Sequence, residues 1–282
     1  MDKRGIEERF YECLMAFSML VVIGSLLVMV AVVVFKGAPA LSISMITQTP
    51  RGGYYLGKEG GILNAIVGSL CLAGGATALA FVISLPVALY LEEYAGKSKL
   101  ASFTRLSLDV LGGVPSIVYG AFGFTFMLYL GVRASLLWGI ITVALLVLPI
   151  MTRAMDEVVR AIPLELREAS YALGATKLET VLKVMSRQAL PGILTAVLLA
   201  FGRGIGDSAS VLLVAGYTDY IPHSLFDPVA TLPLAVFFQI GTPFPKVQER
   251  AYASAVVLLG IVLSLSVASR LLTKKFMKYV VK

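Results

Sequence analysis

The sequence predicts an all-α polytopic membrane protein that crosses the bilayer six times. Of its 282 residues, 58% are hydrophobic and only 15% are charged. Soluble globular chains carry about 25% charged residues, so a soluble chain of this length would have too little polar surface to cover its core. The apolar residues also gather in runs close to the roughly 20 residues that a helix needs to span the hydrocarbon core.

Six apolar runs meet this length requirement. In chain order they cover residues 14–36, 65–91, 106–130, 135–152, 190–217 and 252–272. The third run is interrupted near its start by Asp109, Gly112, Gly113 and Pro115. Neighbouring helices or a wet cavity must satisfy the backbone groups that such a break leaves unpaired.

Lys and Arg residues divide unevenly between the two sides of this topology. On one side, the N-terminus holds three of them, the two loops hold three and six, and the tail from Arg270 holds five, which makes 17 in all. The loops on the other side hold five. Cytoplasmic loops carry the excess of Lys and Arg, so both termini are expected in the cytoplasm.

The expected organisation is one transmembrane domain, residues 14–272, between two cytoplasmic ends. Residues 1–13 form the N-terminal end and residues 273–282 a basic tail. The outer loops are expected at 37–64 and 218–250, and the longest cytoplasmic loop at 153–188.

The net charge of +7 does not indicate a nucleic-acid partner. The basic residues lie in short segments between the apolar runs, and the sequence has no basic face interleaved with aromatic side chains of the kind that would favour nucleic-acid binding. The expected surroundings are the lipid bilayer, and no nucleic acid is expected to bind.

The cytoplasmic loop has the pattern of two short helices joined by a sharp turn. Pro163 suits a helix start, and Gly174 is placed to end that helix in a left-handed conformation. Thr176 and Glu179 have the spacing of a capping box that opens a second helix. The loop is therefore expected to form a knob that a soluble partner could grip, and the alternative is an ordinary amphipathic connector.

Part of this loop resembles a known motif. Glu168, Ala169 and Ser170, followed by Gly174, resemble the EAA loop of ABC importer permeases, whose pattern is Glu-Ala-Ala, three residues, then Gly. The resemblance implies that these four residues form a coupling helix that sits in a cleft of an ATPase subunit. Ser170 departs from the family's Ala, and residues 184–187 depart from its usual Ile-x-Leu-Pro ending.

Longer segments are similar to phosphate importer permeases, of the PstA type rather than the PstC type. They are residues 60–68, 113–120, 167–177 and 251–253. This resemblance implies a prokaryotic plasma membrane, a second permease subunit, two ATP-binding subunits and an extracytoplasmic phosphate-binding protein. ATP and Mg would then be bound by the ATPase subunits, and this chain would bind no cofactor and catalyse no reaction.

Arg203 and Asp207 place charge inside the fifth apolar run. A charge at the bilayer centre costs about 3 kcal/mol on insertion scales, so such residues usually line a substrate path or face the bundle interior. Their i, i+4 spacing allows them to pair on one helix face, and Ser208 and Ser210 add hydroxyl groups. These four are the expected substrate-path residues, and a purely structural ion pair is the alternative.

The same stretch resembles the Arg-Ala-x-Gly-Glu-Thr segment of phosphate permeases, in which the Arg and the acid are implicated in transport. Here Gly204, Asp207 and Ser208 stand in place of Ala, Glu and Thr. A guanidinium group offers a planar pair of donors that matches phosphate oxygens.

Two further motifs do not indicate sites. Residues 52–58 imitate a P-loop, but Glu59 stands where Ser or Thr must bind magnesium. His223, the only histidine, lies between Asp219 and Asp227 in an outer loop. A metal site would need a further ligand with its own support, so neither a metal site nor a nucleotide site is expected.

The sequence thus predicts the transmembrane permease subunit of an ATP-driven ABC importer for inorganic phosphate. One alternative is a permease for another oxyanion, such as sulfate, molybdate or tungstate. Another is a self-sufficient anion channel or secondary carrier with Arg203 as its anion site. The cytoplasmic loop discriminates between these, because a carrier needs no ATPase partner.

Overall fold

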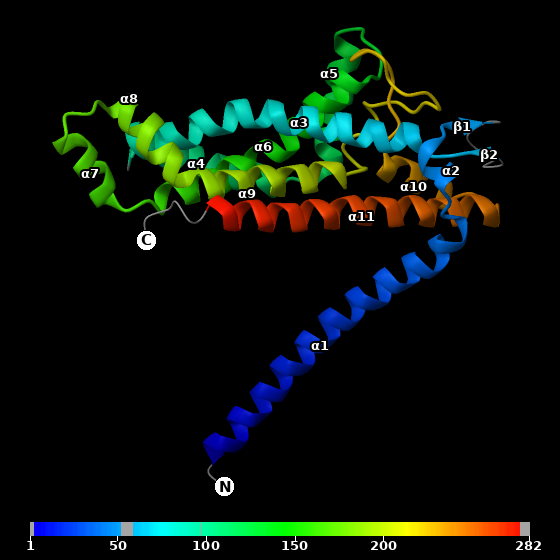
Figure 1. Ribbon diagram of the computed structural model, residues 1–282, viewed down its shortest axis with the longest axis horizontal. Coiled ribbons are helices and arrows are strands. Elements are labelled where there is room, and N and C mark those ends of the chain that lie inside the picture. Colours follow the sequence, from blue (N-terminus) through cyan, green and yellow to red (C-terminus); the bar gives the residue numbers. More distant parts are fainter. Residues whose placement is uncertain (1–2, 52–58, 97, 277–282) are drawn as a thin grey trace.

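The structure, a computed structural model, describes residues 3–51, 59–96 and 98–276. Within these ranges it consists of helices and one two-stranded antiparallel hairpin (Figure 1). The elements are α1 (Lys3–Gly37), α2 (Ile43–Thr47), β1 (Pro50–Arg51), β2 (Glu59–Gly60), α3 (Leu63–Tyr90), α4 (Lys99–Gly112), α5 (Ser116–Tyr129), α6 (Leu136–Arg160), α7 (Leu164–Ala172), α8 (Lys177–Glu179), α9 (Ser186–Ile205), α10 (Leu232–Ile240) and α11 (Pro245–Phe276). Two π-helical turns, η3 (Leu91–Ala95) and η4 (Thr180–Met185), follow α3 and α8.

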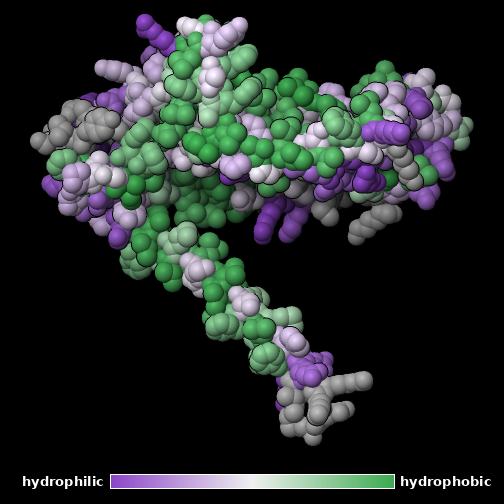
Figure 2. Space-filling model, turned by 180° about the vertical axis from the view of Figure 1, so that it is seen from behind, coloured by the Kyte–Doolittle hydropathy of each residue, from purple (hydrophilic) through white to green (hydrophobic). Residues whose placement is uncertain are grey.

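Five helical segments in the described part of the chain are long and apolar enough to cross a bilayer, and the bent pair α4–α5 brings the number to six if it counts as one span. The five are Glu7–Ala40, Leu63–Ala95, Leu136–Arg160, Lys177–Ile205 and Pro245–Leu271. Hydrophobic side chains form a band across the middle of the bundle, and hydrophilic ones gather at its two ends (Figure 2). The predicted all-α polytopic fold is confirmed.

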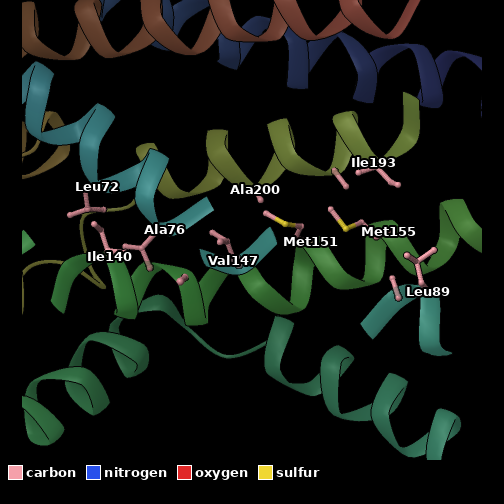
Figure 3. Close-up of a cluster of buried hydrophobic side chains, with 14 of the residues drawn as sticks. Leu72, Ala76, Leu89, Ile140, Val147, Met151, Met155, Ile193 and Ala200 are labelled. Carbon is pink, nitrogen blue, oxygen red and sulfur yellow. The ribbon is translucent and has the colours of Figure 1, made fainter. Parts of the chain in front are cut away.

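The hydrophobic core lies between α3, α6 and α9 (Figure 3). Small residues bring these helices close together, as is usual for helix packing in membranes. A Cβ atom added to Gly139 of α6 would lie 2.7 Å from Cδ1 of Leu72 in α3, so a larger residue there would force the buried Leu72 side chain to move. The buried side chains between the three helices include Ala76, Ile140, Val147, Met151, Met155 and Ala200.

Helix α1 meets the bundle at its C-terminal end and extends away from it (Figure 1). Gly37 lies against α11, where an added Cβ would be 2.7 Å from the backbone of Tyr252. The long apolar window of α1 has no buried residue, and its surface is hydrophobic over most of its length (Figure 2). A helix that is apolar all round is suited to lipid or to an apolar partner.

The third expected span, 106–130, is not one continuous helix. Its residues divide between α4 and α5, which meet at an angle of 97°. Pro115 has no backbone N–H and disfavours helical geometry in the residue before it, and Gly112 and Gly113 weaken the helix further. The interruption noted in the sequence is therefore a sharp corner.

The fifth expected span, 190–217, is wrong at its outer end. Helix α9 stops at Ile205, and the chain continues through turns. The Asp207 carboxylate accepts a hydrogen bond of 2.8 Å from the backbone N–H of Ser210, and such local bonds compete with helix formation. The segment after α9 stays packed in the bundle and buries Val211, Val214 and Ala215.

The expected outer loops contain regular structure. Loop 37–64 holds α2 and the β1–β2 hairpin, and loop 218–250 holds α10 and the start of α11. Helix α10 is part of the packed bundle, because Leu232 is buried and its backbone N–H donates to the Ser69 hydroxyl of α3 at 2.8 Å. The expected cytoplasmic loop 153–188 is shorter at both ends, because α6 continues to Arg160 and α9 begins at Ser186.

Candidate functional site

The loop between α6 and α9 forms the two short helices and the turn that the sequence predicts. Gly174 has a φ of +84°, the left-handed conformation that lets α7 end sharply. Thr176 and Glu179 form both bonds of a capping box at the start of α8. These bonds lower the pKa of Glu179 to about 2, chiefly because the backbone N–H of Thr176 donates to its carboxylate and also because Lys183 is close.

Helix α7 has one face turned outward and one turned toward the bundle. Glu168, Ala169 and Gly174 are exposed, and Leu173 beside them is 89% exposed. Ser170 is buried, and its hydroxyl lies 2.8 Å from the hydroxyl of Thr180 in η4. The EAA-like residues therefore divide between an outward surface and an inward anchor.

Arg203 lies in the last turn of α9, and Asp207 lies just beyond the helix end. The expected pair forms, with Nη2 of Arg203 3.9 Å from Oδ1 of Asp207. The Arg203 side chain is 48% exposed, whereas that of Asp207 is 5% exposed. The Asp207 carboxylate accepts a hydrogen bond from the Ser210 backbone, and it contacts Arg203 only at 3.9 Å. Most N–H donors of the Arg203 guanidinium are therefore not used by this carboxylate.

The Arg203 side chain faces a groove of about 540 Å³ between α9 and α11. We call it the α9–α11 groove. It contains two guanidinium groups, those of Arg203 and Arg270, and its other walls are hydroxyl-bearing or apolar side chains. The residues lining it are Thr195, Leu198, Leu199, Gly202, Arg203, Val262, Leu265, Ser266, Ser269 and Arg270.

The structure does not bring the two expected serines into this groove. Ser208 is half-buried, and Ser210 is buried with no hydrogen-bond partner for its hydroxyl among the described residues. The sequence interpretation also missed Arg270, which it counted with the basic tail. Its spacing of four from Ser266 on an apolar helix is the signal that places the two on one face.

The two motifs that the sequence left without a site are His223 and the P-loop-like residues 52–58. His223 and Ser224 donate their backbone N–H groups to Oδ2 of Asp227 at 3.0 and 2.9 Å, which forms a local turn. Within the described ranges, no group of three or more His, Cys, Asp or Glu residues is arranged to hold a metal ion. The P-loop-like residues 52–58 lie outside those ranges.

Residues 84–278 match the family model described as the binding-protein-dependent transport system inner membrane component. The chain belongs to this family. It is therefore a multi-pass membrane protein and the transport component of a binding-protein-dependent system, which also contains an ATPase and a substrate-binding protein.

Two curated phosphate permeases are similar to this chain over most of its length. The phosphate transport system permease protein PstA of Haemophilus influenzae is 35% identical over 84% of this chain and 83% of its own length. PstA 1 of Mycobacterium tuberculosis is 36% identical over 80% of this chain and 75% of its own length.

Solved structures of ABC transporters share the fold of this family member. A chain of the MetNI methionine ABC transporter in an inward-facing conformation aligns with a TM-score of 0.64 at 22% identity, covering 76% of this chain and 95% of that one. A chain of a bacterial ABC transporter for alginate import aligns with a TM-score of 0.55 at 14% identity, covering 93% of this chain and 98% of that one.

Proposed function

We propose that this chain is the permease subunit of an ATP-driven importer for inorganic phosphate and that it forms one half of the transport pathway with a second permease subunit. The α9–α11 groove is the observation that carries the proposal. The names of the PstA relatives support phosphate as the substrate.

The position of the groove supports a partner subunit. Arg203 is about half exposed on the surface of this chain, yet leucine and valine side chains of α9 and α11 line the same groove. A guanidinium group facing lipid at that depth would be costly, and ionisable side chains within spans face protein or a water-filled cavity. A second permease subunit facing this surface would enclose the groove as a polar path.

The chemistry of the groove fits an oxyanion. Two guanidinium groups can each offer paired donors to phosphate oxygens, and Thr195, Ser266 and Ser269 supply hydroxyl groups. Asp207 lies 3.9 Å from Arg203 and offsets part of its charge. Partial neutralisation favours release as well as capture, which transport requires.

The outward face of α7 is proposed as the contact with the ATPase. Glu168, Ala169 and Gly174 are exposed there, Ser170 anchors the helix from behind, and Leu173 offers an apolar side chain at the tip. Two ATP-binding subunits would bind ATP and Mg and would act through this face and its counterpart on the second permease. This chain would then hydrolyse nothing itself.

The orientation is proposed with α7, α8 and both termini in the cytoplasm. The excess of Lys and Arg in those segments supports this orientation. The β1–β2 hairpin and α10 lie at the other end of the bundle (Figure 1), where an extracytoplasmic phosphate-binding protein would dock.

The test is uptake of labelled phosphate into proteoliposomes that hold the complete complex, with the binding protein outside and ATP inside. We expect uptake that unlabelled phosphate competes away and that sulfate, molybdate and tungstate leave unchanged. ATP-driven uptake of one of those anions instead would overturn the phosphate assignment and leave the architecture intact.

A further inference from the structure

Charged side chains form a compact cluster where α3, α4, α6 and α7 meet. It contains four carboxylates and four guanidinium groups joined by ion pairs of 2.6 to 3.8 Å. We call this set the charge cluster; its members are Glu92, Glu93, Arg105, Asp109, Arg153, Asp156, Arg160 and Arg167.

Asp156 of α6 is the buried centre of the charge cluster. Its side chain has no solvent exposure, and Arg105 of α4 binds it with two hydrogen bonds of 2.8 and 2.9 Å. Arg153 adds a third of 3.2 Å. Bidentate charged bonds of this kind fix geometry, so α4 and α6 are held together firmly at this point.

Arg105 also joins this centre to the end of α3. Its Nη2 donates to Oε2 of Glu92 at 3.3 Å and its Nη1 to the carbonyl of Gly96 at 3.4 Å. Glu92 and Glu93 lie in the π-helical turn η3. π-Helical turns are rare in proteins, and those that do occur are often found at functional sites.

Arg167 connects this assembly to α7. Its Nη1 lies 3.6 Å from a carboxylate oxygen of Glu92 and 3.6 Å from one of Glu93, and its Nη2 donates to the carbonyl of Val159 in α6 at 3.2 Å. Tyr171, one helical turn further along α7, donates its hydroxyl to Glu93. Helix α7 is therefore tied to η3, the turn that follows α3, through two side chains and to α6 through one.

The Arg167 contacts allow small displacements to be passed on. Both 3.6 Å distances exceed the usual 2.7–3.2 Å of an N–H···O hydrogen bond, so the Arg167 guanidinium contacts two carboxylates and is bonded tightly to neither. The next residue, Glu168, is on the outward face of the same helix. Force on that face thus reaches Glu92, Arg105 and Asp156 within a few side chains.

We propose that Arg167, assisted by Tyr171, is the positioning residue that transmits movement of α7 to α3 and α4 through the charge cluster. This inference rests on the proposed function, because it assigns to Arg167 the link between ATP hydrolysis on the partner subunits and the change in the pathway. Arg167 touches neither substrate nor nucleotide.

The experiment compares phosphate uptake with ATP hydrolysis in the reconstituted complex. The variants are Arg167→Gln, which removes the charge, and Tyr171→Phe, which removes only the hydroxyl bond to Glu93. Arg133→Gln is the matched control, because it makes the same substitution at an exposed arginine that lies outside α7 and outside the charge cluster. Assembly is checked by co-purification of the ATPase subunits.

We expect the Arg167→Gln complex to assemble and to hydrolyse ATP at a rate within about two-fold of wild type. The amount of phosphate transported per ATP hydrolysed should fall about ten-fold, which is the size of effect expected when the coupling between two sites is lost. Tyr171→Phe should lower the same ratio by a smaller factor, and Arg133→Gln should not change it. A purely structural role would lower uptake and hydrolysis together and leave the ratio unchanged.

Two outcomes overturn the inference. One is an unchanged ratio of uptake to hydrolysis in Arg167→Gln. The other is a loss of assembly in Arg167→Gln together with an unchanged ratio in Tyr171→Phe. Failure of the proposed function would look different, because the wild-type complex itself would then show no ATP-driven phosphate uptake.

Discussion

The hydroxyl groups of Ser170 and Thr180 lie 2.8 Å apart, and both side chains are buried between α7 and η4. Ser170 stands where the EAA pattern has its second alanine. An alanine there would pack but would form no hydrogen bond. The departure from the pattern thus adds a bond that holds α7 to the segment leading into α9.

Replacing Ser170 with alanine should loosen this contact. A buried hydroxyl left without its partner costs roughly 1–3 kcal/mol, so local opening of η4 should become about five-fold to a hundred-fold more frequent. Hydrogen exchange of the amides around residue 180 in the assembled complex measures this. Ser107→Ala is the control, because the exposed Ser107 hydroxyl only bonds the carbonyl of Phe103 in its own helix. Equal exchange in wild type and Ser170→Ala would contradict the anchoring role.

Arg203→Gln should lower phosphate uptake strongly while the complex still assembles. A charge-assisted hydrogen bond contributes roughly 1.5–3 kcal/mol, which corresponds to about ten-fold or more in uptake at low phosphate. Arg203→Lys should retain part of the activity, because it keeps the charge and loses the planar pair of donors. Arg133→Gln in an exposed turn is the control. Full uptake in Arg203→Gln would contradict a role in the substrate path and would show that the Arg203–Asp207 pair is structural.

Arg270→Gln should raise the phosphate concentration needed for half-maximal uptake. Arg270 lines the α9–α11 groove with Arg203, and two cations attract an anion more strongly than one. We expect this concentration to rise a few-fold. On a logarithmic scale, the change is roughly a third to a half of the loss of uptake expected for Arg203→Gln. Lys274→Gln, four residues along the same helix and no part of the groove lining, should show wild-type uptake. Identical kinetics in wild type and Arg270→Gln would exclude Arg270 from the path.

The capping box of α8 predicts a pH dependence. The pKa of Glu179 is lowered to about 2 from an ordinary value of 4.5, so its ionised form contributes stability above pH 4.5, and that contribution is lost as the pH falls toward 2. Glu179→Gln keeps the acceptor and removes the charge. The thermal midpoint of the variant should lie below that of wild type at pH 7, and the gap should close on acidification through this window. A gap that stays constant between pH 7 and pH 3 would contradict the assignment.

The elements determined by local chemistry were predictable from the sequence. The turn at Gly174 and the capping box of Thr176 and Glu179 depend on residues within a few positions of one another. The apolar runs likewise indicated where the spanning helices lie, although the third run divides between α4 and α5 and the fifth continues beyond the end of α9. For these features the printed sequence contains all the interacting groups.

The features that depend on distant residues were not predictable. The apolar run continues past Ile205, but the segment after α9 hydrogen-bonds to distant parts of the chain. The Ser135 backbone N–H, for example, donates to the Val214 carbonyl at 3.0 Å. Arg167 meets Glu92 and Glu93, which lie more than 70 positions earlier in the chain, only because the fold brings η3 and α7 together. Arg270 joins Arg203 because α9 and α11 lie side by side.

The central claim is that this chain moves phosphate at the expense of ATP hydrolysed by its partners. The most direct test is labelled phosphate uptake into proteoliposomes containing the complete complex and external binding protein, with and without internal ATP. The account predicts uptake only when both ATP and binding protein are present. Equal uptake without ATP would contradict it and would identify the chain as a self-sufficient carrier or channel.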